Sequence, residues 1–179
     1  LARSATTPPP CVFGDPSGSP TVVLFGDSHA AQWFPALLSL AQKHHWRLLS
    51  RTKSGCPAPD VTVFQRTLKR PFDECDAWRR NVLHEVSGLT PPVLVVAAGT
   101  RTESLVDRST GQLMDPGRAP AEWQAGWRRT LAAAERTGVR IAVLRDTPWP
   151  GTDIPVCLAQ HAGDPAACDV STRALDSAA

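Results

Sequence analysis

The segment at residues 21–28 constrains the fold of this chain more than any other part of it. Thr21 to Phe25 form a continuous run of β-branched and apolar residues, and Gly26-Asp27-Ser28 follows directly. Such a run, ending in small and polar residues, is typical of a strand buried on both faces of a parallel sheet. A helix should follow at once, with Ser28 at or next to its N-terminus. The segment therefore predicts an α/β fold.

The rest of the chain continues the alternation of strands and helices. Strands are predicted at residues 46–50, 92–97 and 139–144, and helices at residues 30–43, 72–89, 119–137 and 172–179, the last capped by Ser171. Prolines make the segment after residue 144 irregular in this interpretation. Strands and helices alternating at this spacing favour a three-layer α/β/α sandwich with a mainly parallel sheet.

Composition indicates a single globular domain. The chain has 179 residues, and 42% of them are hydrophobic, enough for a sizeable core. The formal net charge is +2 with both signs mixed along the chain, which argues against nucleic acid or a membrane surface as the main partner. The domain is expected to be monomeric. Apolar runs are far shorter than the about 20 residues of a membrane span. Residues 1–20 include a Pro-rich stretch and are interpreted as a linker or N-terminal extension within a longer protein.

The five cysteines contain no C-x-x-C pair, which argues against a zinc ribbon or a thioredoxin-like site. Cys56 and Cys75 bracket one Pro-rich, charged loop, and Cys157 and Cys168 bracket another. Loops of this kind favour the disulfides Cys56–Cys75 and Cys157–Cys168 in an oxidising compartment. Cys11 is then left over, and we expect its partner beyond Ala179. Five reduced cysteines in a cytosolic protein are the alternative.

The Gly26-Asp27-Ser28 turn is the candidate reactive site. Ligands of parallel sheets collect at the carboxyl ends of the strands, where Ser28 is expected. Backbone N–H groups at a helix start favour an attacking oxygen and a developing oxyanion. Gly26 allows a sharp turn, and Asp27 can brace it by accepting neighbouring N–H groups. An ordinary helix cap explains the same residues, and local chemistry alone leaves both interpretations open.

Residues 22–30, Val-Val-Leu-Phe-Gly-Asp-Ser-His-Ala, resemble block I of the SGNH/GDSL hydrolase superfamily. From about Cys11 onward the chain is similar to the SGNH domain fused to bacterial acyltransferase-3 membrane proteins. Residues 53–57, Lys-Ser-Gly-Cys-Pro, resemble the second block, and Asp146-Thr147-Pro148 and the Cys157–Cys168 segment match the same subfamily in order. The resemblance implies an SGNH-hydrolase, flavodoxin-like fold, Ser28 as the nucleophile, Gly55 as an oxyanion-hole donor and a supporting, substrate-lining role for His29.

Two departures from the superfamily pattern matter. The third block has an asparagine that completes the oxyanion hole, whereas Thr100 or Arg101 occupies that approximate place here and is equally interpretable as a solvated loop residue. No His has an Asp three residues before it, so the Asp-x-x-His block with the catalytic base is missing from residues 1–179 and is expected beyond Ala179. We therefore interpret residues 21–179 as an SGNH-like domain truncated at its C-terminus. His161, with Asp164 nearby, is a weaker candidate base.

The resemblance implies an O-acyltransferase that passes an acyl group, expected to be acetyl, through an acyl-serine to a hydroxyl of a cell-wall or surface glycan. A glycan O-acyl esterase and a non-catalytic domain that binds glycan or docks on a partner are the alternatives. The expected partner is an acyltransferase-3 membrane domain in the same polypeptide, which tethers this domain outside the cytoplasm. No cofactor or metal is expected. Trp149 is the candidate for sugar contact, and the 179 residues alone are expected to be inactive.

Overall fold

The computed structural model of the protein describes residues 2–89, 92–100, 102–147 and 150–170. The chain divides into two compact units, residues 1–144 and 145–179, which are considered separately. Five features of the sequence analysis lie outside the described residues: Arg101, Pro148, Trp149, the cap at Ser171 and the helix expected at residues 172–179.

The first unit contains the strands that the sequence predicts at residues 21–25, 46–50, 92–97 and 139–144. Its strands are β1 (Phe13–Gly14), β2 (Thr21–Gly26), β3 (Arg47–Thr52), β4 (Phe64–Gln65), β5 (Arg70–Pro71), β6 (Pro92–Ala97) and β7 (Arg140–Val143), of which the short β1, β4 and β5 are not predicted by the sequence analysis. Its helices are α1 (Ser28–Ala31), α2 (Phe34–His44), α3 (Asp73–Ser87) and α4 (Ala119–Glu135), with a 3-10 turn, η1, at Thr102–Ser104. A separate short hairpin pairs β4 with β5.

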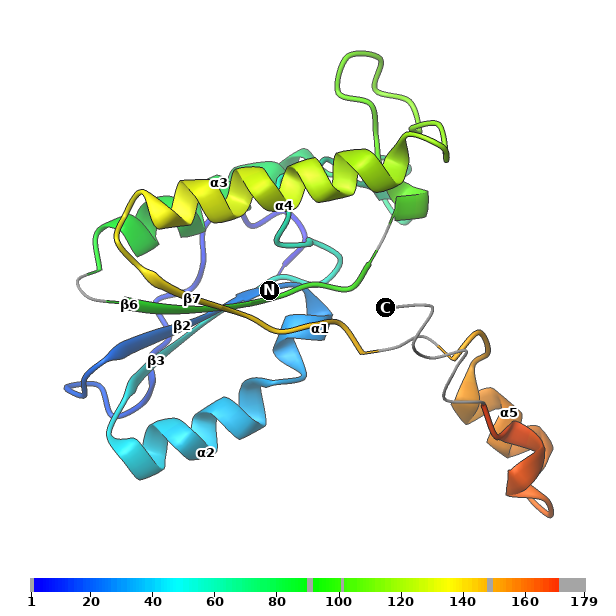
Figure 1. Ribbon diagram of the computed structural model, residues 1–179, viewed down its shortest axis with the longest axis horizontal. Coiled ribbons are helices and arrows are strands. Elements are labelled where there is room, and N and C mark those ends of the chain that lie inside the picture. The colour runs from blue at the N-terminus through cyan, green and yellow to red at the C-terminus, as the bar shows by residue number, and fades with distance from the viewer. Residues whose placement is uncertain (1, 90–91, 101, 148–149, 171–179) are drawn as a thin grey trace. The chain divides into compact units, whose positions relative to one another are not determined.

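The main sheet has the strand order β1-β3-β2-β6-β7. β2 lies at its centre and pairs in parallel with both β3 and β6, β7 is parallel to β6, and the short β1 is antiparallel to β3. Helices α3 and α4 cover one face of this sheet, and α1 and α2 lie on the other (Figure 1). The predicted three-layer α/β sandwich with a mainly parallel sheet is confirmed.

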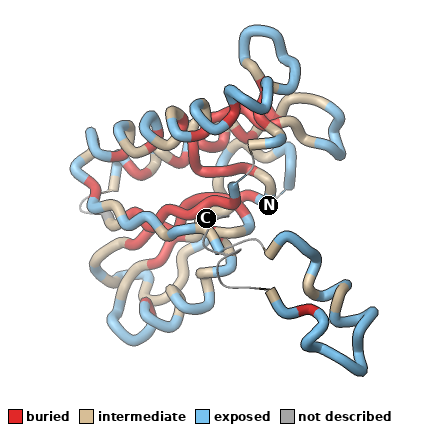
Figure 2. Tube along the Cα trace, turned by 45° about the vertical axis from the view of Figure 1, so that its right-hand side comes forward, coloured by how far each residue is buried: buried red, intermediate tan, exposed pale blue. Residues whose placement is uncertain are grey.

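Alternate residues of β2 fill two separate hydrophobic cores. Val23 and Phe25 pack into the core beneath α3 and α4, where the Phe25 ring lies against Trp78. Val22 and Leu24 pack into the core on the side of α1 and α2. All four side chains are buried, and in Figure 2 the central strands of the sheet are red while exposed residues lie along the helices on either side. A strand with both faces buried needs a continuous apolar run, which is why this segment is so readily recognised in the sequence.

The single helix predicted after β2 is wrong, because two helices occupy this segment. α1 ends at Ala31, a turn follows, and α2 begins at Phe34 with Pro35 in its first turn. Proline has no N–H to donate to the carbonyl four residues earlier, which belongs to Ala31, and its ring clashes with that carbonyl. Pro35 therefore interrupts the helix but is well tolerated at the start of the next one.

The second unit contains a helix where an irregular loop is predicted. α5 (Ile154–Gln160) begins after Asp153, whose carboxylate accepts the Val156 N–H at 3.1 Å, and η2 (Pro165–Cys168) follows. The disulfide Cys157–Cys168 joins the two elements. The prediction fails because Pro155 was interpreted as a helix breaker, whereas it occupies the first turn. No helix within the described residues has both the length and the apolar content needed to cross a bilayer.

Candidate active site

The turn after β2 is fixed by the carboxylate of Asp27. Asp27 is fully buried, caps α1, and accepts the N–H of His29 at 2.9 Å. It also accepts the N–H of Gly99, at 3.2 Å through Oδ1 and at 3.1 Å through Oδ2. The local bracing of the turn follows the sequence prediction. The bond to Gly99 does not, because no local pattern connects residues so far apart in the chain.

Gly26 allows the turn to lie directly against β6. Its φ is +147°, in a region that other residues rarely adopt, and a Cβ placed on it would lie 1.8 Å from the carbonyl oxygen of Ala97. Any side chain at this position would force β2 and β6 apart. Ser28 follows two residues later as the first residue of α1, and it is exposed.

The parallel register brings three loops to one edge of the sheet. Gly26 pairs with Thr52 at the end of β3 and with Ala97 at the end of β6, so the three strands end at the same level. The loops that carry Ser28, Gly55 and Thr100 therefore start from adjacent positions. This edge is where ligands of open parallel sheets bind.

Gly55 occupies a tight turn after β3. The Cys56 N–H donates to the Lys53 carbonyl at 3.0 Å, and Gly55 has φ +71°, the conformation that a type II turn requires of its third residue. A disulfide from Cys56 to Cys75 ties the turn to α3. The turn is therefore fixed both by a backbone hydrogen bond and by a covalent link.

The cysteines pair as the sequence predicts. Cys56–Cys75 and Cys157–Cys168 are both bonded. Cys11 is exposed and forms no disulfide with any cysteine of the described residues. The partner expected for Cys11 beyond Ala179 lies outside the described residues, as does the Asp-x-x-His block expected there, and both stay predictions.

A small cavity lies beside the Gly55 turn. Its volume is about 250 Å³, and its lining comes from three segments: Gly55, then Phe64, Gln65 and Arg66, and finally Glu103 and Ser104. Glu103 and Ser104 belong to η1, in the loop after β6. The turn after β3 and the loop after β6 therefore share one hollow.

Two backbone donors at this sheet edge have no hydrogen-bond partner in the part of the chain that the structure describes. Within the described residues, no hydrogen bond uses the N–H of Ser28 or the N–H of Gly55. Most buried N–H groups of folded proteins are paired, and unpaired ones at the surface are available to water or to a ligand. The resemblance assigns Gly55 to the oxyanion hole and Ser28 as the nucleophile, so both donors belong to residues of the candidate site.

His29 packs against the loop after β6. A Cβ placed on Gly99 would lie 2.7 to 2.9 Å from three atoms of the His29 ring, so only a glycine allows the imidazole to rest on this backbone. Thr100 follows and is exposed. His161 and Asp164, the weaker candidates for a base, belong to the second unit, as does Asp146. Among the described residues, no group of three or more His, Cys, Asp or Glu side chains is arranged to hold a metal.

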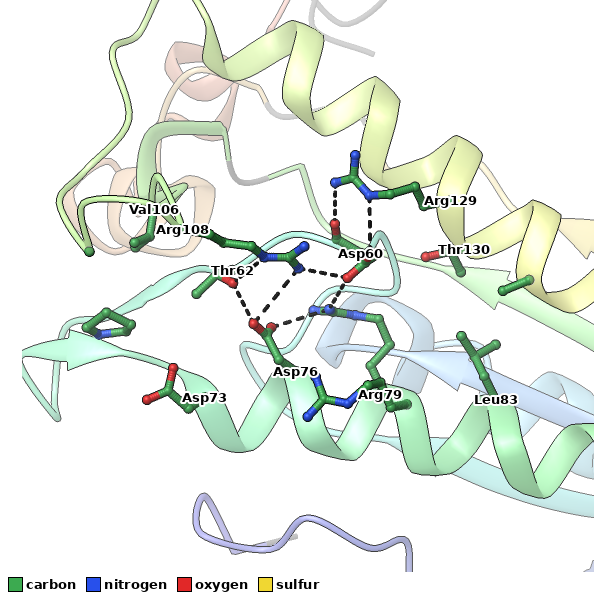
Figure 3. A pocket seen from close by; sticks show the side chains of 14 residues that line it. Asp60, Thr62, Asp73, Asp76, Arg79, Leu83, Val106, Arg108, Arg129 and Thr130 are labelled. Carbon is green, nitrogen blue, oxygen red and sulfur yellow. Dashed lines mark hydrogen bonds and ion pairs between the residues drawn. The ribbon is translucent and has the colours of Figure 1, made fainter.

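A larger cavity, of about 650 Å³, lies between α3 and α4 and holds a network of ion pairs (Figure 3). Arg79 is almost fully buried and donates to Asp60 at 3.4 Å and to Asp76 at 3.3 Å. Arg108 and Arg129 approach Asp60 from other sides, at 2.7 and 3.1 Å. Sequence reasoning missed this network because its members are scattered along the chain among ordinary surface charges.

The guanidinium groups of these arginines donate hydrogen bonds to carboxylates and backbone carbonyls within the protein. Besides the carboxylates, Arg79 donates to the carbonyls of Pro57 and Val61, and Arg129 donates to the carbonyl of Asp60. Burial alone would raise the pKa of Asp60, but the hydrogen bond and charge of Arg108, together with Arg79 and Arg129, hold it below its usual value. The network therefore braces the loop at residues 57–62 between the two helices.

Residues 2–178 match the sequence model of a protein family, the SGNH domain fused to AT3 domains. The chain belongs to this family. Its fold is also similar to a solved structure, the periplasmic domain of a lipopolysaccharide acetyltransferase from Salmonella ser. Paratyphi A, with a TM-score of 0.51 and 18% identity. The match covers 79% of this chain and 52% of that one, so this SGNH domain spans about half the length of that structure. No curated protein sequence matches the chain.

Proposed function

We propose that this SGNH domain carries out O-acyl transfer through Ser28, outside the cytoplasm and next to an acyltransferase-3 domain of the same polypeptide. The observation that carries the proposal is the shared sheet edge, where the loops of Ser28 and Gly55 start from paired strand ends. Both residues have a backbone N–H without a hydrogen-bond partner among the described residues. Membership of a family fused to AT3 domains supports an acyltransferase partner. The two disulfides support an oxidising compartment.

In the proposed reaction, the Ser28 hydroxyl oxygen attacks the carbonyl carbon of an acyl donor. The hydroxyl proton passes to a histidine base, which we expect as part of an Asp/His pair beyond Ala179, and the negative charge on the carbonyl oxygen is stabilised by the N–H groups of Ser28 and Gly55. Collapse of this intermediate expels the donor's leaving group and leaves an ester on Ser28. A glycan hydroxyl then takes the acyl group, and the serine hydroxyl is restored.

The other residues at the edge have supporting roles in this proposal. Asp27 holds the turn and the loop after β6 together, and His29 lines the site beside Ser28. Thr100 or Arg101 is the third oxyanion position, and Trp149 contacts sugar. The cavity of about 250 Å³ beside Gly55 is large enough for a short acyl group such as acetyl.

The experiment is a comparison of wild type and Ser28→Ala in the full gene product. Acetyl transfer to a glycan and hydrolysis of 4-nitrophenyl acetate are both measured. We expect both rates to fall by about 10³-fold or more in the variant, since removing a nucleophile leaves only binding and oxyanion stabilisation. Ser39→Ala, on the exposed surface of α2, is the matched control.

The outcomes separate the candidate functions. Transfer to glycan that exceeds hydrolysis supports the acyltransferase, and hydrolysis without transfer supports a glycan esterase. If Ser28→Ala retains full activity, both enzymatic functions are wrong. Glycan binding without any turnover, in a gene product that lacks an Asp-x-x-His block, would support the non-catalytic role.

A further inference from the structure

Lys53 lies two residues before Gly55, and its side chain is almost completely buried, with 1% exposure. Its ammonium group donates to three backbone carbonyls of the N-terminal segment: Ala2 at 3.2 Å, Arg3 at 2.8 Å and Ala5 at 2.6 Å. An ammonium has three N–H donors, and all of them are used here. Buried lysines are rare unless they are paired, so this arrangement requires an explanation.

The surroundings of Lys53 make the charge tolerable, although no carboxylate of the described residues forms a direct ion pair with it. The ammonium lies 5.2 Å from the centre of the Phe72 ring, a favourable cation–π distance. Burial lowers the pKa of Lys53, and the negative charge of Glu74 opposes this shift. The stabilisation therefore depends mainly on the three carbonyl oxygens. Without the N-terminal segment, the ammonium would lose all three of these acceptors.

The segment is shaped to present these carbonyls together. The Ala5 N–H donates to the Ala2 carbonyl at 3.1 Å, which folds residues 2–5 into a turn around the ammonium. A second anchor lies just beyond, where Asn81 of α3 donates to the Thr6 carbonyl at 2.8 Å. The contacts use backbone oxygens, so they depend on the path of the segment and not on its side chains.

The backbone of Lys53 joins the two halves of the candidate site. Its N–H donates to the Gly26 carbonyl at 3.0 Å, immediately before the Ser28 turn. Its carbonyl accepts the Cys56 N–H at 3.0 Å and closes the turn that contains Gly55. One residue therefore connects the N-terminal segment, the base of the Ser28 turn and the Gly55 turn.

We propose that Lys53 is a positioning residue: by binding the carbonyls of Ala2, Arg3 and Ala5, it holds the Gly55 turn in the conformation that presents the Gly55 N–H as an oxyanion donor. This role rests on the proposed function of Gly55. Residues 2–5 thereby support the candidate site through Lys53, and displacing this segment makes the Gly55 turn less rigid. A lysine suits this role because three carbonyls can surround its compact ammonium, whereas the donors of arginine are spread over a planar guanidinium group.

The first test measures hydrogen–deuterium exchange of the full chain and needs no activity. In Lys53→Met, which keeps the length and apolar stem of the side chain, we expect the two hydrogen-bonded amides of this segment, those of Lys53 and Cys56, to exchange on the order of tenfold faster or more, because the turn loses its anchor. Amides of residues 94–96 in β6 should keep their wild-type rates. Lys43→Met, at an exposed lysine of α2, is the matched control and should change neither region.

Two further variants keep the test decisive if Lys53→Met does not fold. Deleting residues 1–6 removes the acceptors and leaves Lys53 in place, and it should speed exchange at these two amides in the same way. Lys53→Arg keeps the charge and should restore protection only in part. Unchanged exchange at these two amides in a folded Lys53→Met or deletion variant overturns the proposal. Equally faster exchange in β6 also overturns it, because Lys53 would then contribute only to global stability.

A kinetic comparison in the full gene product separates this proposal from the proposed function. With 4-nitrophenyl acetate, Lys53→Met should lower kcat by about tenfold or more and leave KM nearly unchanged, because an oxyanion donor acts in the transition state. A change in KM alone would contradict positioning of the oxyanion donor. Turnover that does not depend on Ser28 would overturn the proposed function, and the exchange result would still decide whether Lys53 holds the turn.

Discussion

The buried carboxylate of Asp27 accepts the backbone N–H of Gly99 through both of its oxygens, at 3.2 and 3.1 Å. The same carboxylate caps α1 by accepting the His29 N–H. A single charged group thus joins the turn after β2 to the loop after β6. Bonds from N–H groups to a buried carboxylate are stronger than those between neutral groups, so this link should hold the two loops firmly.

Replacing Asp27 with Asn should therefore weaken both links. The amide has only one carbonyl oxygen and no charge, so it cannot reproduce the two-oxygen contact with Gly99. We expect the free energy of unfolding to fall by about 1.5–3 kcal/mol, measured by urea denaturation. The exposed N-cap Asp153 provides the control, because Asn caps a helix about as well as Asp, and Asp153→Asn should have little effect. Equal effects at the two positions would contradict the special role of the Gly99 contact.

Gly26→Ala tests the close approach of β2 and β6. The added methyl group would overlap the Ala97 carbonyl oxygen in a backbone conformation that alanine already disfavours, so we expect a loss of at least about 3 kcal/mol in thermal or chemical unfolding. Gly138→Ala is the matched comparison. Gly138 also has a positive φ, of +73°, but no atom lies within 4 Å of its would-be Cβ. A loss of only about 1 kcal/mol is expected there, and the difference between the variants isolates the steric overlap.

The ion-pair network around Asp60 predicts a specific loss of stability in acid. The pKa of Asp60 is lower in the folded protein than in the unfolded chain, so its carboxylate stabilises the fold fully above the unfolded value of about 4. This contribution is lost as the pH falls below about 4 and through the folded pKa. In Asp60→Asn, unfolding measurements at several pH values should show a shallower decline of stability in this range than wild type does.

At neutral pH the same variant should be less stable by about 1–3 kcal/mol, because Arg79 remains buried with one of its two carboxylate partners removed. Asp73→Asn is a suitable control, since Asp73 lines the same cavity but is largely exposed. Its carboxylate lies 3.9 Å from the Arg70 guanidinium, which is a long distance for an ion pair. A pH profile of Asp60→Asn that parallels wild type would show that another group causes the acid response.

The two disulfides should contribute very differently to the stability of the first unit. Cys56–Cys75 closes a loop of 19 residues within that unit, and the double variant Cys56→Ala/Cys75→Ala should lose about 3 kcal/mol by the loop-entropy argument. Cys157→Ala/Cys168→Ala alters only the second unit and should leave the first nearly unchanged. Tryptophan fluorescence during denaturation reports on Trp78 and Trp123 in the core of the first unit. Free thiols at Cys56 and Cys75 in the mass spectrum of the unreduced protein would refute this pairing.

The sequence predicted the sheet well because β2 and β6 are buried on both faces, and such strands have an unmistakable apolar run. The helix boundaries were predicted less well at prolines, because proline interrupts the interior of a helix but is favoured in its first turn. The apolar pattern predicts one helix across Pro35, which divides α1 from α2, and the sequence predicts a loop at Pro155, which lies in the first turn of α5. In both cases the position of the proline relative to the first helical turn decides the outcome, and composition does not reveal that position.

At the candidate site, the sequence identified Ser28 and the Gly55 turn but neither the Asp27 contact with Gly99 nor the burial of Lys53. Both contacts use backbone groups, the N–H of Gly99 and the carbonyls of Ala2, Arg3 and Ala5. A backbone group is present at every residue and so leaves no signal in the sequence. Long-range contacts of this kind can be recognised only after the chain is folded.

Strands β2, β3 and β6 end at the same level of the sheet, and this affects how the loops that follow them can vary in this family. Each loop at the sheet edge starts from a strand end whose position is set by the paired register, at Gly26, Thr52 and Ala97. An insertion or deletion within one loop need not displace the starting points of the other two, and surface loops tolerate such changes well. The loop after β6 can therefore change in length beyond Gly99 while the contact between Asp27 and Gly99 keeps the turn of Ser28 in place.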